Sequence, residues 1–268
     1  MTRFLIVPQW QGSPSARAML LTDGAAAIAG DLPRRDTTML DVPLEAGDSL
    51  GTGIRRLSAL LRTRELVAEH IAGASERIVV VGGDCSVSVH ALSAIDTSDV
   101  AVLWCDAHPD LNDVSTSPSG AFAGMALRAV MGEGEPRLAL SPGVPAERVV
   151  LLGSRAVDDT ERDALDGITV LSPDSLGDVG AVAAAVRATG ATRVWVHVDV
   201  DVLDPAEFEG VSDAAPFGVT VTALVDSLRR LREQLPLAGA TIAGFAPRSP
   251  ADAVLDLGAI LRLIGAVA

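Results

Sequence analysis

The chain has 268 residues, of which 49% are apolar and 21% charged, so it has enough apolar material to form one large domain spanning residues 1–268. Its formal net charge of −14 repels phosphate backbones and no basic cluster offsets it, which excludes nucleic acid as a partner. Lysine is absent, and Schiff-base catalysis and the phosphate-binding loop of nucleotide hydrolases both require that amine, so these two classes are excluded as well.

The first ten residues predict a short strand and not a secretion signal, because they lack a basic segment, a long apolar run and a cleavage site. We therefore expect a cytoplasmic protein. No apolar run is long enough to cross a bilayer, so no membrane partner is expected. The two cysteines, Cys85 and Cys105, lie beside or inside apolar runs, which argues against a secreted disulfide framework.

Short apolar runs alternate along the chain with longer segments rich in Ala, Leu and Arg. The short runs predict strands at residues 4–7, 38–42, 77–81, 100–105, 148–152, 168–171, 193–198 and 241–245. The clearest helical patterns cover residues 53–72, 179–189, 219–235 and 251–267. Residues 132–145 are rich in Gly and Pro and predict a surface loop. This alternation predicts a three-layer α/β/α fold with a mostly parallel sheet of about eight strands.

Three of the predicted strands end in polar segments, at the edge where open parallel sheets bind their ligands. These segments are GGDCS at residues 82–86, DAHPD at residues 106–110 and DVDVLDP at residues 199–205. The strand ends are therefore the place to look for chemistry.

Alternating ligand-type residues in these segments predict a metal site. Asp106, His108 and Asp110 share one face if the preceding strand continues, and Asp199 and Asp201 repeat this spacing. One Asp at a strand end is usually a helix cap or a turn residue, but two such clusters weaken that interpretation. Four carboxylates and an imidazole cannot converge in a dry crevice without a cation. They suit divalent manganese and are too rich in oxygen for structural zinc.

The ordered set GGDCS, DAHPD and HVDVDVLDP resembles the signature of the arginase, agmatinase and formimidoylglutamase (ureohydrolase) family, which reads GGDHS, DAHxD and SFDxDxxDP. The resemblance covers residues 4 to about 247 and implies an arginase-like fold, in which two manganese ions activate a bridging water. It also implies a homo-oligomer, for which the sequence shows no interface pattern. One ion would be held by Cys85, Asp106, Asp110 and Asp199, and the other by Asp106, His108, Asp199 and Asp201. Asp110 would be the catalytic proton carrier.

A second set of residues resembles the part of arginases that binds the amino-acid end of the substrate. Asn112, Ser117 and Ser119 match the segment that hydrogen-bonds the α-carboxylate, and Asp158 and Glu161 match the groups that face the α-amino group. Asp158 and Glu161 also have the spacing of a helix N-terminal box, so both interpretations stay open. The resemblance implies a small guanidino or hydroxyguanidino amino acid as the partner.

Three departures from the family pattern bear on the substrate. Cys85 replaces the metal-binding histidine, Ala123 replaces a proton-shuttling histidine, and Gly244 lies where arginases carry the glutamate that pairs with the guanidinium. Loss of these groups fits the less basic Nω-hydroxy-L-arginine. The cysteine also resembles the amidinohydrolases of D-cycloserine biosynthesis, an antibiotic pathway, which release hydroxyurea and L-ornithine.

Two alternatives remain to that substrate. One is an arginase or another guanidino-acid ureohydrolase, and the other, of a different class, is a non-catalytic metal-binding member of the family.

The remaining histidines are expected to have structural roles. His197 lies two residues before Asp199 on the same strand face and is a candidate for orienting a metal ligand. His70 is expected at the surface, and His90 in side-chain packing.

Overall fold

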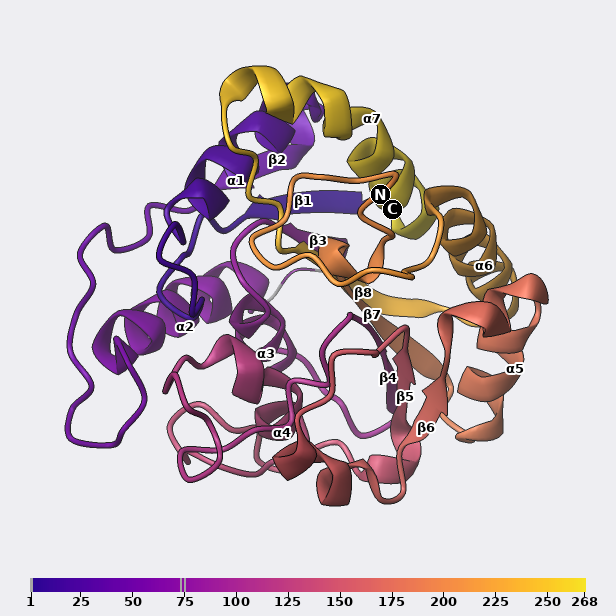
Figure 1. Cartoon of the computed structure of the whole chain (residues 1–268), viewed down its shortest axis with the longest axis horizontal. Coiled ribbons are helices and arrows are strands. Elements are labelled where there is room, and N and C mark those ends of the chain that lie inside the picture. Colours follow the sequence, from indigo (N-terminus) through magenta and orange to yellow (C-terminus); the bar gives the residue numbers. More distant parts are fainter. Residues whose placement is uncertain (1, 73, 75) are drawn as a thin grey trace.

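An eight-stranded parallel sheet forms the centre of the computed structural model, which describes residues 2–72, 74 and 76–268. The strands lie in the order β2-β1-β3-β8-β7-β4-β5-β6, and each neighbouring pair is parallel (Figure 1). Their bounds are β1 Thr2–Ile6, β2 Thr37–Met39, β3 Arg77–Val81, β4 Val100–Cys105, β5 Val149–Leu152, β6 Thr169–Leu171, β7 Arg193–Asp199 and β8 Leu237–Ala243. The α-helices are α1 Leu20–Asp31, α2 Leu57–Ile71, α3 Ser86–Leu92, α4 Ala126–Val130, α5 Ala181–Ala188, α6 Val221–Gln234 and α7 Pro250–Val267.

The two faces of the sheet carry separate hydrophobic clusters, because successive residues of a strand point to opposite faces. In β1, Phe4 and Ile6 belong to one cluster and Leu5 belongs to the other. The first cluster packs against α1, α5, α6 and α7, and the second against α2, α3 and α4, so that helices cover both sides of the sheet (Figure 1). The predicted three-layer α/β/α fold is confirmed.

The structure corrects three details of the sequence prediction. The last strand is β8 Leu237–Ala243 and not residues 241–245, because Gly244 follows it with a left-handed φ of +84° that leaves the extended region. Helices α1, α3 and α4 lie outside the clearest helical patterns. Of these, α3 and α4 have only 7 and 5 residues, too few for a helical period to show. The segment 132–145 is not purely a surface loop, since Leu138 and Leu140 are buried in the second cluster.

The strand order places the functional candidates at one crossover. The chain builds β1, β2 and β3 in one half of the sheet and β4, β5 and β6 in the other, and then inserts β7 and β8 between the halves. The loops after β3 and β4 lead to α3 and α4 on one face of the sheet, whereas the loops after β7 and β8 lead to α6 and α7 on the other face, which is the kind of switch point where parallel sheets form a crevice. Among the described residues, no helix is both long enough and apolar enough to span a membrane.

Candidate metal centre

Three strand ends bring the predicted ligands together. After β3, Gly82 and Gly83 take left-handed φ values of 91° and 79°, and this turn puts Cys85 at the start of α3. Asp106 follows β4 directly, and Asp199 is the last residue of β7. Because β4 and β7 are neighbours in register, with Cys105 opposite Val198, the two aspartates leave the sheet side by side.

Each of three carboxylates is fixed through one oxygen and leaves the other free to face the cluster. The backbone N–H of His108 donates to Asp106 Oδ1 at 2.7 Å, and that of Asp201 donates to Asp199 Oδ1 at 3.0 Å. The N–H of Ala107 donates to Asp201 Oδ1, also at 3.0 Å, and so ties the β4 end to the β7 end. The backbone thus orients the carboxylates before any ligand binds.

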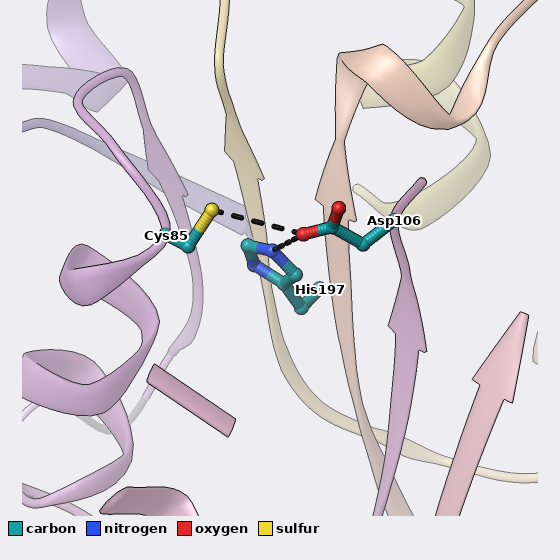
Figure 2. Close-up of side chains that lie close together, drawn as sticks. All are labelled: Cys85, Asp106 and His197. Atoms are coloured by element: carbon teal, nitrogen blue, oxygen red, sulfur yellow. Dashed lines mark hydrogen bonds and ion pairs between the residues drawn. The ribbon is translucent and has the colours of Figure 1, made fainter. Parts of the chain in front are cut away.

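The remaining ligand atoms gather around Asp106. Cys85 Sγ lies 3.7 Å from Asp106 Oδ2 and 3.1 Å from Asp199 Oδ2. On the other side, His108 Nδ1 lies 3.5 Å from Asp106 Oδ1 and 2.9 Å from Asp201 Oδ2. His197 on β7 points its Nε2 at Asp106 Oδ2 from 3.8 Å, so that Cys85, Asp106 and His197 face one another (Figure 2).

Asp110 reaches the site by a route that differs from the sequence prediction. The strand does not continue to Asp110, because β4 ends at Cys105, so residues 106, 108 and 110 do not share a strand face. Asp110 instead adopts a left-handed φ of 54°, a conformation that Asp tolerates better than most residues. Its side chain is buried, and within the described residues its Oδ2 has no hydrogen-bond partner.

Burial and neighbouring carboxylates raise the pKa values of several groups in this centre. Burial, with added repulsion from Asp106, raises the pKa of Asp110 well above its ordinary value. Burial followed by the charge of Asp201 does the same to the pKa of Asp199, and burial with Asp106 raises the pKa of Asp201 to about 6. The Cys85 thiol also has a pKa well above its ordinary value, because it is buried and lies beside Asp110.

The positive charge of His108 offsets part of the negative charge of the carboxylates. Burial alone would lower its pKa, but hydrogen bonds to Asp106 and Asp201 raise it to about 12. Burial would likewise raise the pKa of Asp106, but the neighbouring imidazoles of His108 and His197 bring it below its ordinary value. One imidazolium does not balance four carboxylates, and in the described part of the chain an oxygen of Asp110 has no partner. The residues therefore fit a pair of divalent cations, which would neutralise them.

The candidates for substrate binding flank this centre. The amide of Asn112 donates to Asp158 Oδ2 at 3.3 Å, which links two of them. Ser117 and Ser119 are half-buried, their hydroxyl oxygens lie 3.4 Å apart, and each accepts a backbone N–H in its own turn. The buried carboxylate of Glu161 accepts from the N–H of Leu111 and of Asp158, so it holds the backbone beside Asn112 and Asp158.

Two positions that depart from the family pattern lie in confined places. A side chain at Gly244 would place its Cβ 2.1 Å from Asp199 Oδ1, and the left-handed backbone there disfavours any other residue. Ala123 is 7% exposed, and its N–H donates to the carbonyl of Gly12.

Arg155 has a structural role that the sequence pattern did not reveal. Its guanidinium donates to the carbonyls of Asp201, Val202 and Leu203 and to that of Ala215, and so holds the loop after β7 in place. An arginine that binds carbonyls leaves no charge pattern in the sequence, so no signal there marks it. His197, by contrast, does have a sequence signal, which is its two-residue spacing from Asp199. That spacing indicates only a supporting role.

Comparisons with known proteins agree with this geometry. The family model described as the Arginase family matches residues 20–259. The chain belongs to the arginase family. It is therefore a hydrolase of the ureohydrolase group, which acts on carbon–nitrogen bonds of linear amidines.

Two curated relatives and one solved structure illustrate the range of this family. An N(omega)-hydroxy-L-arginine amidinohydrolase from Streptomyces lavendulae is 30% identical over 90% of this chain and 88% of its own length. An arginase from Bacillus caldovelox is 32% identical over 71% of this chain and 67% of its own length. The structure of Entamoeba histolytica arginase in complex with L-ornithine is 19% identical, covers 98% of each chain and has a TM-score of 0.83. The last comparison concerns the fold alone.

Proposed function

We propose that this member of the arginase family is a dinuclear manganese amidinohydrolase that cleaves Nω-hydroxy-L-arginine to L-ornithine and hydroxyurea. The family membership supports amidine hydrolysis, and the relative from Streptomyces lavendulae, which matches along most of both chains, supports the hydroxylated substrate. The site residues decide how the reaction proceeds.

The carboxylates and their neighbours would hold two ions. Cys85, Asp106, Asp110 and Asp199 would hold one ion, and Asp106, His108, Asp199 and Asp201 would hold the other. When bound, two divalent ions supply Lewis acidity that lowers the pKa of water from about 15.7 toward about 7, as a single zinc ion does in carbonic anhydrase. Asp106 and Asp199, each fixed through Oδ1, keep their Oδ2 atoms directed at Cys85.

Asp110 is the proposed proton carrier. Its Oδ2, which has no hydrogen-bond partner among the residues that the structure describes, can accept the proton that the attacking water loses and donate it to the nitrogen that leaves the amidine carbon. Burial and the neighbouring carboxylates raise the pKa of Asp110 above that of an ordinary carboxyl, which makes it a better proton acceptor than an exposed aspartate. Its buried position also keeps bulk water from competing for the proton.

The observation that carries the substrate assignment is the geometry at Gly244. The family's guanidinium-pairing glutamate is replaced by a glycine whose backbone passes so close to Asp199 that a Cβ would collide with the carboxylate. This backbone cannot present an acidic side chain to a guanidinium. An N-hydroxyguanidine is less basic than a guanidine and has less need of that anion, so it suits this site better.

The amino-acid end of the substrate would bind along the flank. Asn112, Ser117 and Ser119 offer an amide and two hydroxyls to an α-carboxylate. Asp158 is exposed and offers a carboxylate to an α-ammonium group, while Glu161 positions the backbone that carries Asp158. This set predicts an α-amino acid and disfavours agmatine, which lacks the α-carboxylate.

A turnover assay in manganese with three separate substrates tests the proposal. We expect kcat/KM for Nω-hydroxy-L-arginine to exceed that for L-arginine by about 10²–10⁴, because arginine needs the proton shuttle and charge partner that Ala123 and Gly244 lack. L-Ornithine and hydroxyurea are measured as products, and agmatine should be the poorest substrate.

The other results of this assay identify the competing functions. Comparable efficiency on arginine and hydroxyarginine would support an arginase. No turnover of any of the three by protein with full metal content would support a non-catalytic family member.

A further inference from the structure

His197 has the features of a metal ligand and not only of a supporting residue. The side chain is fully buried, and Ser88 Oγ lies 2.7 Å from Nδ1. The ring stacks on Trp104 with 3.7 Å between the ring centroids. These contacts fix the ring, and Nε2 is left without a hydrogen-bond partner among the described residues while it faces Asp106 Oδ2. Metal-binding histidines usually have one nitrogen held by an oxygen and the other directed at the ion.

The distances among the ligand atoms near His197 lie outside the ideal spacing of one coordination sphere by only about 0.2 Å or less. A tetrahedral ion with nitrogen and oxygen at about 2.0–2.2 Å and sulfur at about 2.3 Å keeps its ligand atoms roughly 3.3–3.6 Å apart. Asp106 Oδ2 lies 3.7 Å from Cys85 Sγ and 3.8 Å from His197 Nε2, and Asp199 Oδ2 lies 3.1 Å from Cys85 Sγ. The ligand atoms of Cys85, Asp106 and His197 all lie within 4.8 Å of one another (Figure 2).

The position of His197 also explains the cysteine. The family pattern has histidine where this chain has Cys85, and serine where this chain has His197. An imidazole is thus lost at the start of α3 and gained on β7, and both positions face the same oxygen of Asp106. The two departures compensate each other, with the nitrogen donor moved from one side of the ion to the other.

We propose that His197 binds the same ion as Cys85, Asp106 and Asp199, and that this site selects a softer metal, such as zinc or cobalt(II), over manganese. The proposal rests on the dinuclear site proposed above and specifies one half of it. Thiolate and imidazole favour borderline metals, whereas His108 and Asp201, with the shared carboxylates, form a harder site that suits manganese. In manganese alone, as in the turnover assay, manganese would fill both positions, and with zinc also supplied the centre would hold two different metals.

X-ray absorption at the zinc edge of the wild-type protein, loaded with one equivalent of zinc, tests the coordination directly. We expect one sulfur and one imidazole nitrogen on the ion, with oxygen completing the sphere. Sulfur without imidazole would overturn the role of His197, and imidazole without sulfur would show that zinc prefers the His108 site. Because this measurement needs no variant, it does not depend on whether a substitution folds.

Variants then test whether the two positions act together. In metal-free protein titrated with cobalt(II), the sulfur-to-cobalt absorption band reports binding at Cys85. His197→Ser, which places the family's residue on β7, should weaken cobalt binding more than about tenfold and remove the imidazole from the zinc spectrum. His70→Ser is the matched control, because His70 is an exposed histidine on α2 and its loss should change neither result. A zinc spectrum of His197→Ser that still contains the imidazole would contradict the proposal.

The double variant Cys85→His, His197→Ser restores the family arrangement. We expect its ratio of manganese to zinc affinity to rise at least tenfold over that of the wild type, and an unchanged ratio would contradict the selectivity. Metal content and spectra decide this inference, while turnover decides the proposed function. A chain that hydrolyses hydroxyarginine but shows no imidazole beside sulfur overturns only the inference, and an inactive chain with both ligands on zinc overturns only the function.

Discussion

Two buried polar clusters lie next to each other at the carboxyl edge of the sheet. They differ in how many of their polar atoms have hydrogen-bond partners within the cluster. One is the hydrogen-bonded network of Gln9, Asp84, Ser86 and His90, around the ends of β1 and β3. Gln9 Nε2 donates to Ser86 Oγ at 2.5 Å, His90 Nε2 lies 3.0 Å from Gln9 Oε1, and Asp84 Oδ2 accepts the N–H of Gly12 at 2.9 Å. The other is the metal cluster at the ends of β4 and β7 and the start of α3. Among the described residues, this cluster leaves Asp110 Oδ2 and His197 Nε2 without partners, whereas the network leaves His90 Nδ1 without one but pairs both oxygens of Asp84.

This difference separates a structural role from a binding role. Both clusters contain a buried aspartate, and burial raises the pKa of Asp84 as it does that of Asp110. Asp84, however, accepts hydrogen bonds from Ser86, Gln9 and Gly12, whereas Asp110 faces the like charges of Asp106 and Asp199, which His108 offsets only in part. Buried groups that bind one another hold the fold together, and buried groups that repel one another need a ligand. Four predictions test this distinction, ordered from the largest to the smallest expected change in activation or unfolding free energy.

The largest effect is expected from Asp110→Asn. The amide cannot carry a proton between water and the leaving nitrogen, so kcat/KM should fall by about 10²–10⁴, or roughly 3–5 kcal/mol, for hydroxyarginine. Steady-state assays measure this. In the metal-free protein the same change should leave the unfolding free energy equal or higher, because it removes a repelled charge. A clear loss of metal-free stability would show that Asp110 belongs to the fold.

Asp84→Asn should have the opposite profile. Its amide NH2 would replace one of the two oxygens and face the N–H of either Gly12 or Ser86, which costs about 1–3 kcal/mol of unfolding free energy. Chemical denaturation of the metal-free protein measures the loss, with Asp110→Asn as the matched control. Equal unfolding free energies for the two variants would remove the distinction between the clusters.

His90 should make the network sensitive to acid. Burial, followed by the charge of Arg64, lowers its pKa from 6.5 to about 3. The unfolded chain therefore binds more protons between these values, and stability that is present above pH 6.5 is lost as the pH falls. The loss should be about 2 kcal/mol between pH 6.5 and 5. His90→Gln keeps a donor for Gln9 and should flatten this slope, while the exposed His70→Gln should not. Identical slopes in all three proteins would contradict the prediction.

The smallest effect is expected at Ala123, whose segment is tied to the network through Gly12. Ala123→His would restore a titrating group and should raise kcat/KM for arginine about tenfold, or about 1.4 kcal/mol, with little change for hydroxyarginine. Ala123→Asn adds polar bulk without a proton to exchange and serves as the control. An equal gain in both variants would show that proton transfer is not what position 123 lacks.

The sequence alone determined the fold class and predicted the strand ends at which the candidate ligands lie. Alternating apolar runs predicted the parallel sheet, because burial on both faces selects such runs, and acidic residues after two of them predicted where ligands bind. What it could not determine was the direction of single atoms. Asp110 arrives through a left-handed turn and not along a strand, and the end of β8 depends on the approach of Gly244 to Asp199.

His197 shows the same limit most clearly. Its spacing from Asp199 placed it on the correct face of β7, but the sequence could not predict the orientation of its ring. Ser88 and Trp104 lie 109 and 93 positions away in the chain, and they decide which nitrogen is held and which faces Cys85. Side-chain periodicity fixes a face, whereas the orientation of a ring on that face depends on neighbours that only the packed sheet and helix bring together.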